Sequence, residues 1–257
     1  MRIARYSAGA DVGFGVVEGD GEAAVLAVIA GHPFSAFEFS GERLPVAEVR
    51  LLAPVIPSKI VAVGKNYAEH AAEMGGEAPA EPLIFLKPST AVIGPGDAIV
   101  YPAASQRVDF EGELAAVIGR LSRRVPERDA LAAVLGYTCA NDVTARDQQQ
   151  SDGQWSRAKG HDTFCPLGPW IETGLDPSAV AISTDLNGER RQRGNTSDLV
   201  HPVAALIAYI SSVMTLLPGD VVLTGTPAGV GPMNAGDEVS VTIEGIGTLT
   251  NRVTADG

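Results

Sequence analysis

The sequence predicts an α+β fold dominated by β-sheet. Glycine and proline are frequent, at 29 and 17 of 257 residues, whereas aromatic residues make up only 5% of the chain. This composition favours many short strands joined by tight turns over a helical bundle. Short apolar segments bounded by turn residues recur along the chain, but the regular strand–helix alternation of a doubly wound parallel sheet is missing.

Residues 1–56 are expected to form a small N-terminal β domain, and residues 57–257 a larger domain. Pro54 and Pro57 bracket the boundary between the two. The N-terminal domain is predicted to contain three strands joined by Gly-rich turns and then a polar loop: Met1–Tyr6, Asp11–Glu18, Glu22–Ile29 and Ser40–Arg43. A chain of this length can bury a substantial core in such an arrangement.

The larger domain is predicted to consist mainly of strands, because its apolar segments are short and bounded by Gly, Pro or polar residues. The predicted strands are Lys59–Val63, Leu83–Leu86, Ala98–Tyr101, Glu111–Ile118, Tyr137–Asn141, Trp170–Thr173, Asp220–Thr224, Glu238–Ile243 and Gly247–Val253. The segment Ala181–Arg190 reads as a hairpin that turns at Asn187-Gly188, a dipeptide that suits tight hairpin turns.

Helices are expected to be few. Tyr67–Met74 is predicted to be a short helix that starts at Asn66, whose side chain can cap it, and ends at Gly75-Gly76. Three further segments are predicted to be helical at least in part: Arg128–Val134, Pro202–Thr215 and the polar run Thr144–Gly160, which also contains a covering loop.

The formal net charge of −12 argues against nucleic acid or an anionic membrane as a partner. No apolar segment approaches the roughly 20 residues of a transmembrane helix. The apolar stretch Ala23–Ala30 follows acidic rather than basic residues, unlike the core of a secretory signal. The two cysteines, Cys139 and Cys165, are therefore expected to be reduced thiols, and the protein is expected to be cytoplasmic.

Three acidic residues predict a metal site. Glu111 and Glu113 stand two apart in an apolar run, so in a strand both side chains leave the same face. Two like charges on a partly buried face need a positive partner, and Asp142 can supply a third oxygen ligand. No His or Cys lies near enough in the sequence to be expected as a further ligand, so the three carboxylates favour Mg²⁺ or Mn²⁺ over Zn²⁺. The alternative is a strand that turns its polar face to water.

A candidate general base lies on the first predicted helix. His70 and Glu73 are three residues apart and so share a face of Tyr67–Met74. A carboxylate beside an imidazole fixes its tautomer and raises its basicity near neutral pH. The following Gly75-Gly76 would let this helix move as a lid. The alternative is a surface pair of no catalytic consequence.

Further polar residues are candidates for catalysis or substrate contacts. Lys159 could stabilise developing enolate or oxyanion charge, and Lys87 could meet a substrate carboxylate. Gln149 could reach a ligand, as could Arg146 and the hydroxyl of Thr226 in a Gly-rich loop. The structural alternatives are a solvated lysine, a lysine that extends from a strand end, and an ion pair of Arg146 with its neighbour.

Six short motifs occur in an order that resembles the fumarylacetoacetate hydrolase superfamily, specifically its short bacterial members. They are Gly64-Lys65-Asn66-Tyr67-Ala68-Glu69-His70, Phe85-Leu86-Lys87-Pro88, Phe110-Glu111-Gly112-Glu113-Leu114, Asn141-Asp142-Val143-Thr144-Ala145-Arg146-Asp147, Ala158-Lys159 and Thr224-Gly225-Thr226-Pro227. The similarity covers about residues 57–254. No single motif is specific, but the ordered set is.

The resemblance implies a mixed β-sheet roll of the fumarylacetoacetase C-terminal type, usually a homodimer, with Mg²⁺ or Mn²⁺ held by the three carboxylates. It assigns a lid dyad, an active-site lysine and a ligand-facing glutamine to His70, Glu73, Lys159 and Gln149. Full-length fumarylacetoacetases carry an additional aspartate ligand just before the histidine. The segment Lys59–Tyr67 contains no acidic residue, which argues against fumarylacetoacetase proper.

The implied substrate is a small 2-oxo or 2-hydroxy-dienoic acid that reacts through a metal-bound enolate. Protonation at another carbon gives isomerisation, loss of CO₂ gives decarboxylation, and water attack on a distal acyl group gives C–C hydrolysis. The leading expectation is an isomerase or decarboxylase of aromatic catabolism, of the 2-hydroxyhepta-2,4-diene-1,7-dioate isomerase type. The alternatives are an acylpyruvate hydrolase or oxaloacetate decarboxylase, and a non-catalytic metabolite-binding protein that kept the fold.

Overall fold

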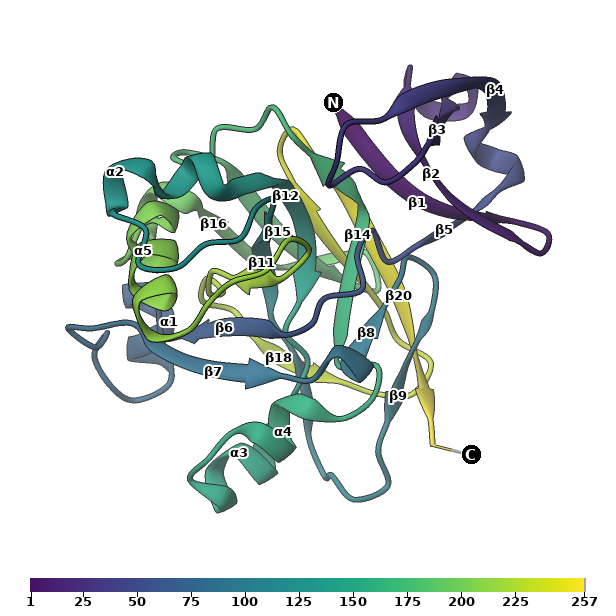
Figure 1. Cartoon of the computed structure of the whole chain (residues 1–257). Coiled ribbons are helices and arrows are strands. Elements are labelled where there is room, and N and C mark those ends of the chain that lie inside the picture. The colour runs from purple at the N-terminus through teal and green to yellow at the C-terminus, as the bar shows by residue number, and fades with distance from the viewer. Residues whose placement is uncertain (257) are drawn as a thin grey trace.

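The fold is built on one large mixed sheet of 12 strands that extends through most of the molecule (Figure 1). The computed structural model describes residues 1–256. Neighbouring strands along the main path are, in order, β4 (Glu38–Pro45), β3 (Val25–Ala30), β2 (Asp11–Glu18), β1 (Arg2–Ala8), β14 (Cys165–Glu172), β12 (Val134–Asn141), β11 (Gly112–Ile118), β17 (Val221–Leu223), β6 (Ile60–Gly64) and β7 (Leu83–Lys87). Beside this path, β5 (Arg50–Leu52) pairs with β1, and β8 (Val92–Ile93) pairs with β14.

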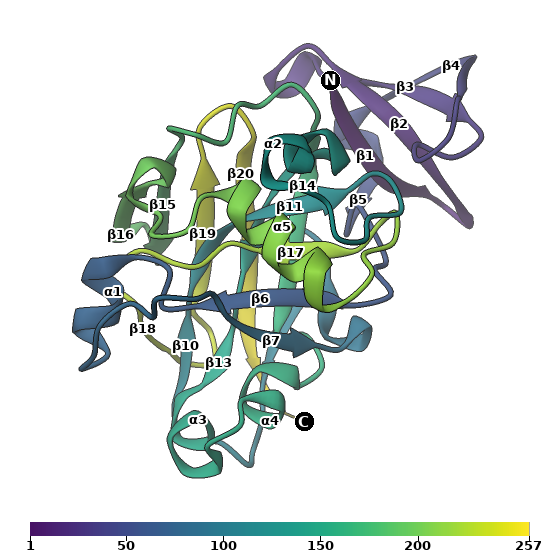
Figure 2. The same cartoon turned by 60° about the vertical axis from the view of Figure 1, so that its left-hand side comes forward.

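Two smaller sheets complete the fold. The five-stranded sheet has the order β16 (Glu189–Asn195), β15 (Ala181–Leu186), β19 (Glu238–Ile243), β20 (Gly247–Ala255) and β9 (Ala98–Tyr101), and the three-stranded sheet the order β13 (Thr144–Ala145), β10 (Val108–Phe110) and β18 (Gly231–Met233). The strands of the five-stranded sheet run across the direction of β6 (Figure 2). The predicted α+β fold dominated by curled β-sheet is therefore confirmed.

The helices are short and lie at the outside of the sheets. They are α1 (Ala68–Glu73), α2 (Glu127–Ala130), α3 (Arg146–Asp152), α4 (Ser156–Gly160) and α5 (Val203–Val213), with 3₁₀ turns η1 (Gly21–Ala23), η2 (Val46–Glu48), η3 (Ser89–Ala91), η4 (Leu131–Ala133) and η5 (Thr196–Asp198). Buried residues of α5 such as Leu206 and Ile210 share one core with Val61 of β6 and Val241 of β19. The large sheet, the five-stranded sheet and α5 thus share one apolar core, to which β6 and β11 both contribute.

The N-terminal strands belong to the same sheet as the rest of the chain. In β1, Arg2 and Ile3 pair with Glu172 and Ile171 of β14. Ile3 also lies in a buried cluster with Ile171 and Ile60 of the larger part. Pairing and core thus continue across the predicted boundary between residues 56 and 57.

Most predicted elements occur within a few residues of their expected bounds, including the hairpin at Asn187-Gly188, where both residues have positive φ. Two predictions are wrong. The expected loop Ser40–Arg43 lies inside β4, an exposed edge strand in which polar residues are readily accommodated. The expected helix Arg128–Val134 is limited to α2 and a 3₁₀ turn, because Val134 pairs with Ile118 as the first residue of β12.

Two further details differ from the sequence-based expectation. Asn66 does not cap α1, because its side chain instead donates to the carbonyl oxygens of His201 and Thr224 and accepts from the His201 amide. Glu111 precedes β11 rather than beginning it, and its amide donates to Oδ1 of Asn141. The amide side chains of Asn66 and Asn141 therefore connect segments that are distant in the sequence.

Cys139 and Cys165 are buried and unpaired, as expected for reduced thiols. Burial raises the pKa of each thiol to about 12, so neither is a reactive thiolate at neutral pH. Among the helices of residues 1–256, none combines the length and apolar character needed to cross a membrane.

Candidate active site

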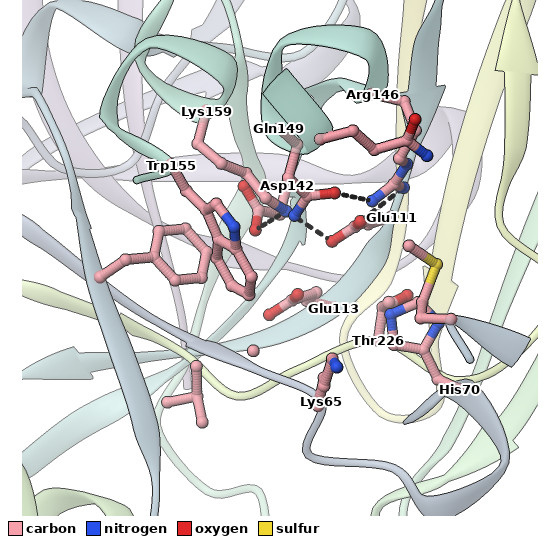
Figure 3. A pocket seen from close by; sticks show the side chains of 15 residues that line it. Lys65, His70, Glu111, Glu113, Asp142, Arg146, Gln149, Trp155, Lys159 and Thr226 are labelled. Atoms are coloured by element: carbon pink, nitrogen blue, oxygen red, sulfur yellow. Dashed lines mark hydrogen bonds and ion pairs between the residues drawn. The ribbon is translucent and has the colours of Figure 1, made fainter. Parts of the chain in front are cut away.

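A pocket of about 180 Å³ opens where β6, the β10–β11 junction, α3 and α4 meet. Its lining contains most of the candidate residues together with an apolar wall: Val63, Gly64, Lys65, His70, Met74, Phe85, Glu111, Glu113, Asp142, Arg146, Gln149, Gln150, Trp155, Lys159 and Thr226. In Figure 3 the carboxylates lie at the centre, the side chains from α3 and α4 on one side, and Lys65 and His70 on the other.

Glu111, Glu113 and Asp142 are brought together as predicted, with one carboxylate oxygen from each lying within 4.8 Å of the others. All three residues are buried, with Glu113 only 1% exposed. Glu113 extends from β11, while Asp142 follows β12 and its amide donates to the carbonyl oxygen of Glu111, 2.8 Å away. The alternative of a polar strand face in water is therefore excluded.

Two of the three carboxylates are neutralised by buried cations. Lys159 Nζ lies 2.8 Å from Glu111 Oε2 and 2.7 Å from Asp142 Oδ2. Lys87 Nζ lies 2.5 Å from Asp142 Oδ1, and Arg146 Nη2 lies 2.7 Å from Glu111 Oε1. The lysines are neither solvated nor extended to the surface, since their side chains are 2% and 0% exposed.

Glu113 has no such cation. Among residues 1–256 it forms no ion pair, and its side chain accepts a hydrogen bond from the Gly225 amide at Oε2, 2.7 Å away. Burial, together with the neighbouring Asp142 and Glu111 charges, raises the pKa of Glu113 well above its ordinary range. The pKa of Glu111 is lowered instead, because Lys159 and Arg146 outweigh the effect of burial.

His70 and Glu73 form the predicted pair on α1, with Nδ1 3.2 Å from Oε2. A carboxylate only accepts hydrogen bonds, so Nδ1 carries the proton and Nε2 is the basic nitrogen. His70 is 5% exposed and lines the pocket, while the Glu73 side chain is 34% exposed, so the imidazole faces the pocket and its carboxylate partner lies toward the surface. Glu73 is fastened in turn by the Gly229 amide, 3.1 Å from Oε1.

The other candidate residues differ in how free they are to meet a ligand. Arg146 donates through all three of its nitrogens, to Asp109, Glu111 and Gln149, so it acts as a scaffold. The Oε1 atom of Gln149 accepts from Arg146, which leaves the amide nitrogen available for a ligand. Burial of Lys87, at 1% exposure, keeps it outside the pocket lining.

Thr226 lines the pocket, but its hydroxyl is committed to the protein. The hydroxyl donates to the carbonyl oxygen of Gly112 at 2.8 Å and accepts from Gln192 Nε2 at 2.7 Å. Gln192 in turn accepts from the Gly112 amide. Thr226 therefore holds the start of β11 in place and can only accept a hydrogen bond from a ligand.

Residues 59–254 match the family described as fumarylacetoacetate (FAA) hydrolase C-terminal. The chain belongs to this fumarylacetoacetate hydrolase family. Residues 1–54 match a second family, described as Rv2993c-like, N-terminal. The resemblance seen in the six motifs is thereby confirmed.

Three proteins that are similar to this member of the fumarylacetoacetate hydrolase family are named as isomerases or as a tautomerase. A crystal structure of 5-carboxymethyl-2-hydroxymuconate delta-isomerase from Mycobacterium smegmatis is 57% identical, with 100% of both chains covered and a TM-score of 0.94. The structure of 2-hydroxyhepta-2,4-diene-1,7-dioate isomerase from Mycobacterium marinum is 53% identical, covering 100% of this chain and 99% of that one, with a TM-score of 0.94. The mitochondrial oxaloacetate tautomerase FAHD2B of Bos taurus is 45% identical over 82% of this chain and 71% of its own.

The carboxylate cluster of this family member fits a divalent cation. Three buried oxygen donors converge, and Glu113 lacks a counter-charge among the described residues. A buried carboxylate without a positive partner is costly, and a hard cation with oxygen ligands relieves that cost. The Glu111, Glu113 and Asp142 carboxylates are the groups that would hold it.

Several residues that build the site were not identified from the sequence. Asp109 anchors Arg146, with Oδ2 2.9 Å from Nε, and the alternation Asp109, Glu111, Glu113 was a usable signal for it. Gln192 reaches Gly112 from a strand 80 residues away, which no local pattern indicates. Lys65 lines the pocket, although its place in the motif Gly64–His70 does not by itself indicate a role.

Proposed function

We propose that this protein is a divalent-metal-dependent enzyme that moves protons on small 2-oxo and 2-hydroxy-dienoic acids. Its leading reaction is isomerisation of the 2-hydroxyhepta-2,4-diene-1,7-dioate type, with tautomerisation of oxaloacetate as the same chemistry on a shorter acid. The observation that carries the proposal is the unneutralised, buried Glu113 carboxylate among two paired ones in a pocket that also contains His70. The names of the mycobacterial and bovine relatives support it.

A bound Mg²⁺ or Mn²⁺ would polarise the C2 oxygen of the substrate and stabilise enolate charge. In the isomerisation, His70 Nε2 takes the proton of the C2 hydroxyl and returns it to C5, so that the dienol becomes a 2-oxo-3-enoate. In the tautomerisation of oxaloacetate, it takes a proton from C3 and returns it to the C2 oxygen. Glu73 holds the ring in the tautomer required for this transfer, since Nδ1 donates to it. Lys159 contributes positive charge, because its pKa is raised by Asp142 and Glu111 despite the opposing effect of burial.

One side of the pocket is apolar. Phe85 and Trp155 form an apolar wall of the pocket, with ring centroids 5.2 Å apart. Gly64 leaves room for this wall, since a Cβ there would lie 2.6 Å from Trp155 Cζ3. The wall excludes solvent from one side of the substrate chain.

The test is a panel of acids assayed on purified protein with Mg²⁺, with Mn²⁺ and after chelation. Oxaloacetate, acetylpyruvate and a 2-hydroxy-dienedioate are compared for tautomerisation, decarboxylation, isomerisation and C–C hydrolysis. We expect metal-dependent proton transfer that is lost in Glu113→Gln and retained in Glu189→Gln, a matched change at an exposed residue. Turnover that persists without metal or in Glu113→Gln would reject the proposal.

A second candidate is acylpyruvate hydrolysis, favoured by the His70–Glu73 pair, which suits activation of water. Decarboxylation of oxaloacetate would need only the stabilised enolate. In His70→Ala, hydrolysis should be lost while decarboxylation survives. If the variant loses neither activity, His70 is not the base.

We also propose that the protein is a homodimer, as the family resemblance implies. Size-exclusion chromatography with light scattering tests this directly. A mass near twice the 26.6 kDa of the chain is expected, and a monomer mass would contradict it.

A further inference from the structure

Lys65 is a pocket-lining cation that the reaction described above does not use. It is half-buried and follows β6 at the pocket wall. Within residues 1–256 its side chain forms neither an ion pair nor a hydrogen bond. The other lysine and the arginine of the lining, Lys159 and Arg146, are both held by carboxylates.

The backbone of Lys65 is unusual. Its φ of +57° lies in the left-handed region, which a lysine adopts only at a conformational cost. Such backbone strain gathers at sites where a side chain must be directed to one place. The neighbouring residues hold this conformation, because Gly64 lies in β6 and the Asn66 side chain is bonded to His201 and Thr224.

The ammonium of Lys65 lies against the turn that ends α1. A Cβ at Gly76 would stand 3.1 Å from Lys65 Nζ, so glycine there leaves the space that Nζ needs. The Lys65 side chain therefore packs against Gly76 in the turn that follows His70 and Glu73. In Figure 3 it lies across the carboxylates from Lys159 and Gln149.

This arrangement separates two positive regions in one pocket. One contains Lys159 beside the carboxylates, where the C1 carboxylate and C2 oxygen of an oxo acid would bind. The other is Lys65, with its charge unneutralised by any described carboxylate. A second carboxylate on the substrate would otherwise face a protein of net charge −12.

We propose that Lys65 binds the distal carboxylate of the substrate and makes the enzyme selective for dicarboxylic over monocarboxylic 2-oxo acids. The inference rests on the proposed function, since it assumes that an oxo acid occupies this pocket. Lys65 is a specificity-determining residue and moves no proton. A lysine that only meets solvent would leave selectivity unchanged when it is replaced.

The test uses 2-oxoglutarate and 2-oxopentanoate, which share the 2-oxo acid end and differ in having a distal carboxylate or a methyl group. Affinity for the Mn²⁺-loaded enzyme is measured by titration calorimetry. We expect the wild type to bind 2-oxoglutarate about tenfold tighter, as a charge-assisted hydrogen bond provides. In Lys65→Met the preference should fall to about one, with 2-oxopentanoate binding unchanged.

Matched variants separate the charge of Lys65 from its position and from the overall field. Lys65→Arg should keep most of the preference, and Arg128→Met, an exposed change on α2, should keep all of it. With oxaloacetate as substrate, Lys65→Met should raise KM about tenfold and leave kcat within about threefold. This split distinguishes lost binding from lost catalysis.

Two results would overturn the inference: a wild type without preference for 2-oxoglutarate, or a Lys65→Met variant that weakens both ligands alike or neither. Failure of the proposed function looks different. In that case the wild type turns over none of the acid panel and binds neither oxo acid, and the assignment of Lys65 falls with it.

Discussion

Glu113 differs from the other two carboxylates of the cluster in having no positive partner among residues 1–256. Glu111 and Asp142 are each bonded to two cationic side chains. The Glu113 carboxylate is therefore the one group of the cluster that lacks a positive counter-charge among the described residues. Two predictions at the scale of single residues follow from this asymmetry.

Replacing Glu113 by glutamine should stabilise the metal-free protein. At a pH above the folded-state pKa of Glu113, the variant removes an unpaired buried charge and keeps an oxygen that can accept from the Gly225 amide. We expect a gain of about 1–3 kcal/mol, or a rise in Tm of about 2–4 °C for each kcal/mol. Calorimetry with and without Mn²⁺ measures this, and the wild type alone should be stabilised by the metal. A lower Tm in the metal-free variant would contradict the account.

Metal affinity should rise with pH. The folded-state pKa of Glu113 is raised above its ordinary 4.5, so its contribution to metal-free stability is present at low pH and lost as pH rises through the folded pKa. Mn²⁺ must displace the same proton. Titration calorimetry in two buffers of different ionisation enthalpy should show proton release below that pKa and weaker binding there. A Mn²⁺ affinity that does not change between about pH 5 and pH 8 would contradict this prediction.

How well single residues can be predicted depends on how local their role is. Glu113 was found from the sequence because a charged residue inside an apolar run is unusual, whereas Lys159 lies in a polar run where a solvated lysine was the alternative. Gln192 was not found, because its polar partner Gly112 is distant along the chain. The commitment of Arg146 to Asp109 was likewise hidden, since the adjacent Asp147 was the obvious partner by sequence.

At the scale of elements, α1 is a six-residue helix fastened at its end by a glycine turn. The amides of Gly75 and Gly76 donate to the carbonyl oxygens of Ala72 and Ala71, and Gly75 has a φ of +76°. A helix this short has little stability of its own. Its position over the pocket depends on this turn and on the bond from the Gly229 amide to Glu73.

Gly75→Ala should loosen α1. Alanine resists the left-handed backbone, at a cost of about 1 kcal/mol. We expect faster amide hydrogen exchange in residues 68–76 and a fall in kcat/KM, with the core strands unchanged. Glu77→Ala, at an exposed position two residues on, is the control. Unchanged exchange in Gly75→Ala would show that the turn does not hold the helix.

Elements were predicted best where one local pattern determined them. In the strand Glu238–Ile243, buried and partly exposed residues alternate as the sequence pattern predicts. The hairpin turns at Asn187-Gly188, as that dipeptide predicts. Strand β4 was missed because it is an exposed edge whose polar residues resemble a loop. Val134 was assigned to a helix because its pairing with Ile118 is not visible in the sequence.

At the scale of the whole molecule, one sheet contains strands from both sides of the predicted domain boundary between residues 56 and 57. β1 pairs with β14, and both contribute to a single buried cluster with β6. The β-rich fold class followed from composition and turn frequency. The order of strands did not, because pairs such as Ile3 with Ile171 depend on the packing of the finished core.

The protein should therefore unfold in one cooperative transition. The division at residue 56 stays a prediction about sequence units, while the continuous sheet couples them energetically. Differential scanning calorimetry of the metal-free protein should show one peak with equal calorimetric and van't Hoff enthalpies. Two separate peaks would mean that residues 1–56 fold independently.

The central claim is that Glu111, Glu113 and Asp142 hold a divalent cation in the pocket that binds the oxo acid. Anomalous diffraction from crystals grown with Mn²⁺ and a slowly reacting oxo acid tests it most directly. The account predicts one strong anomalous peak in contact with oxygens of all three carboxylates and with the ligand. A peak that avoids Glu113, or an ordered oxo acid bound in the pocket without any peak, would contradict it.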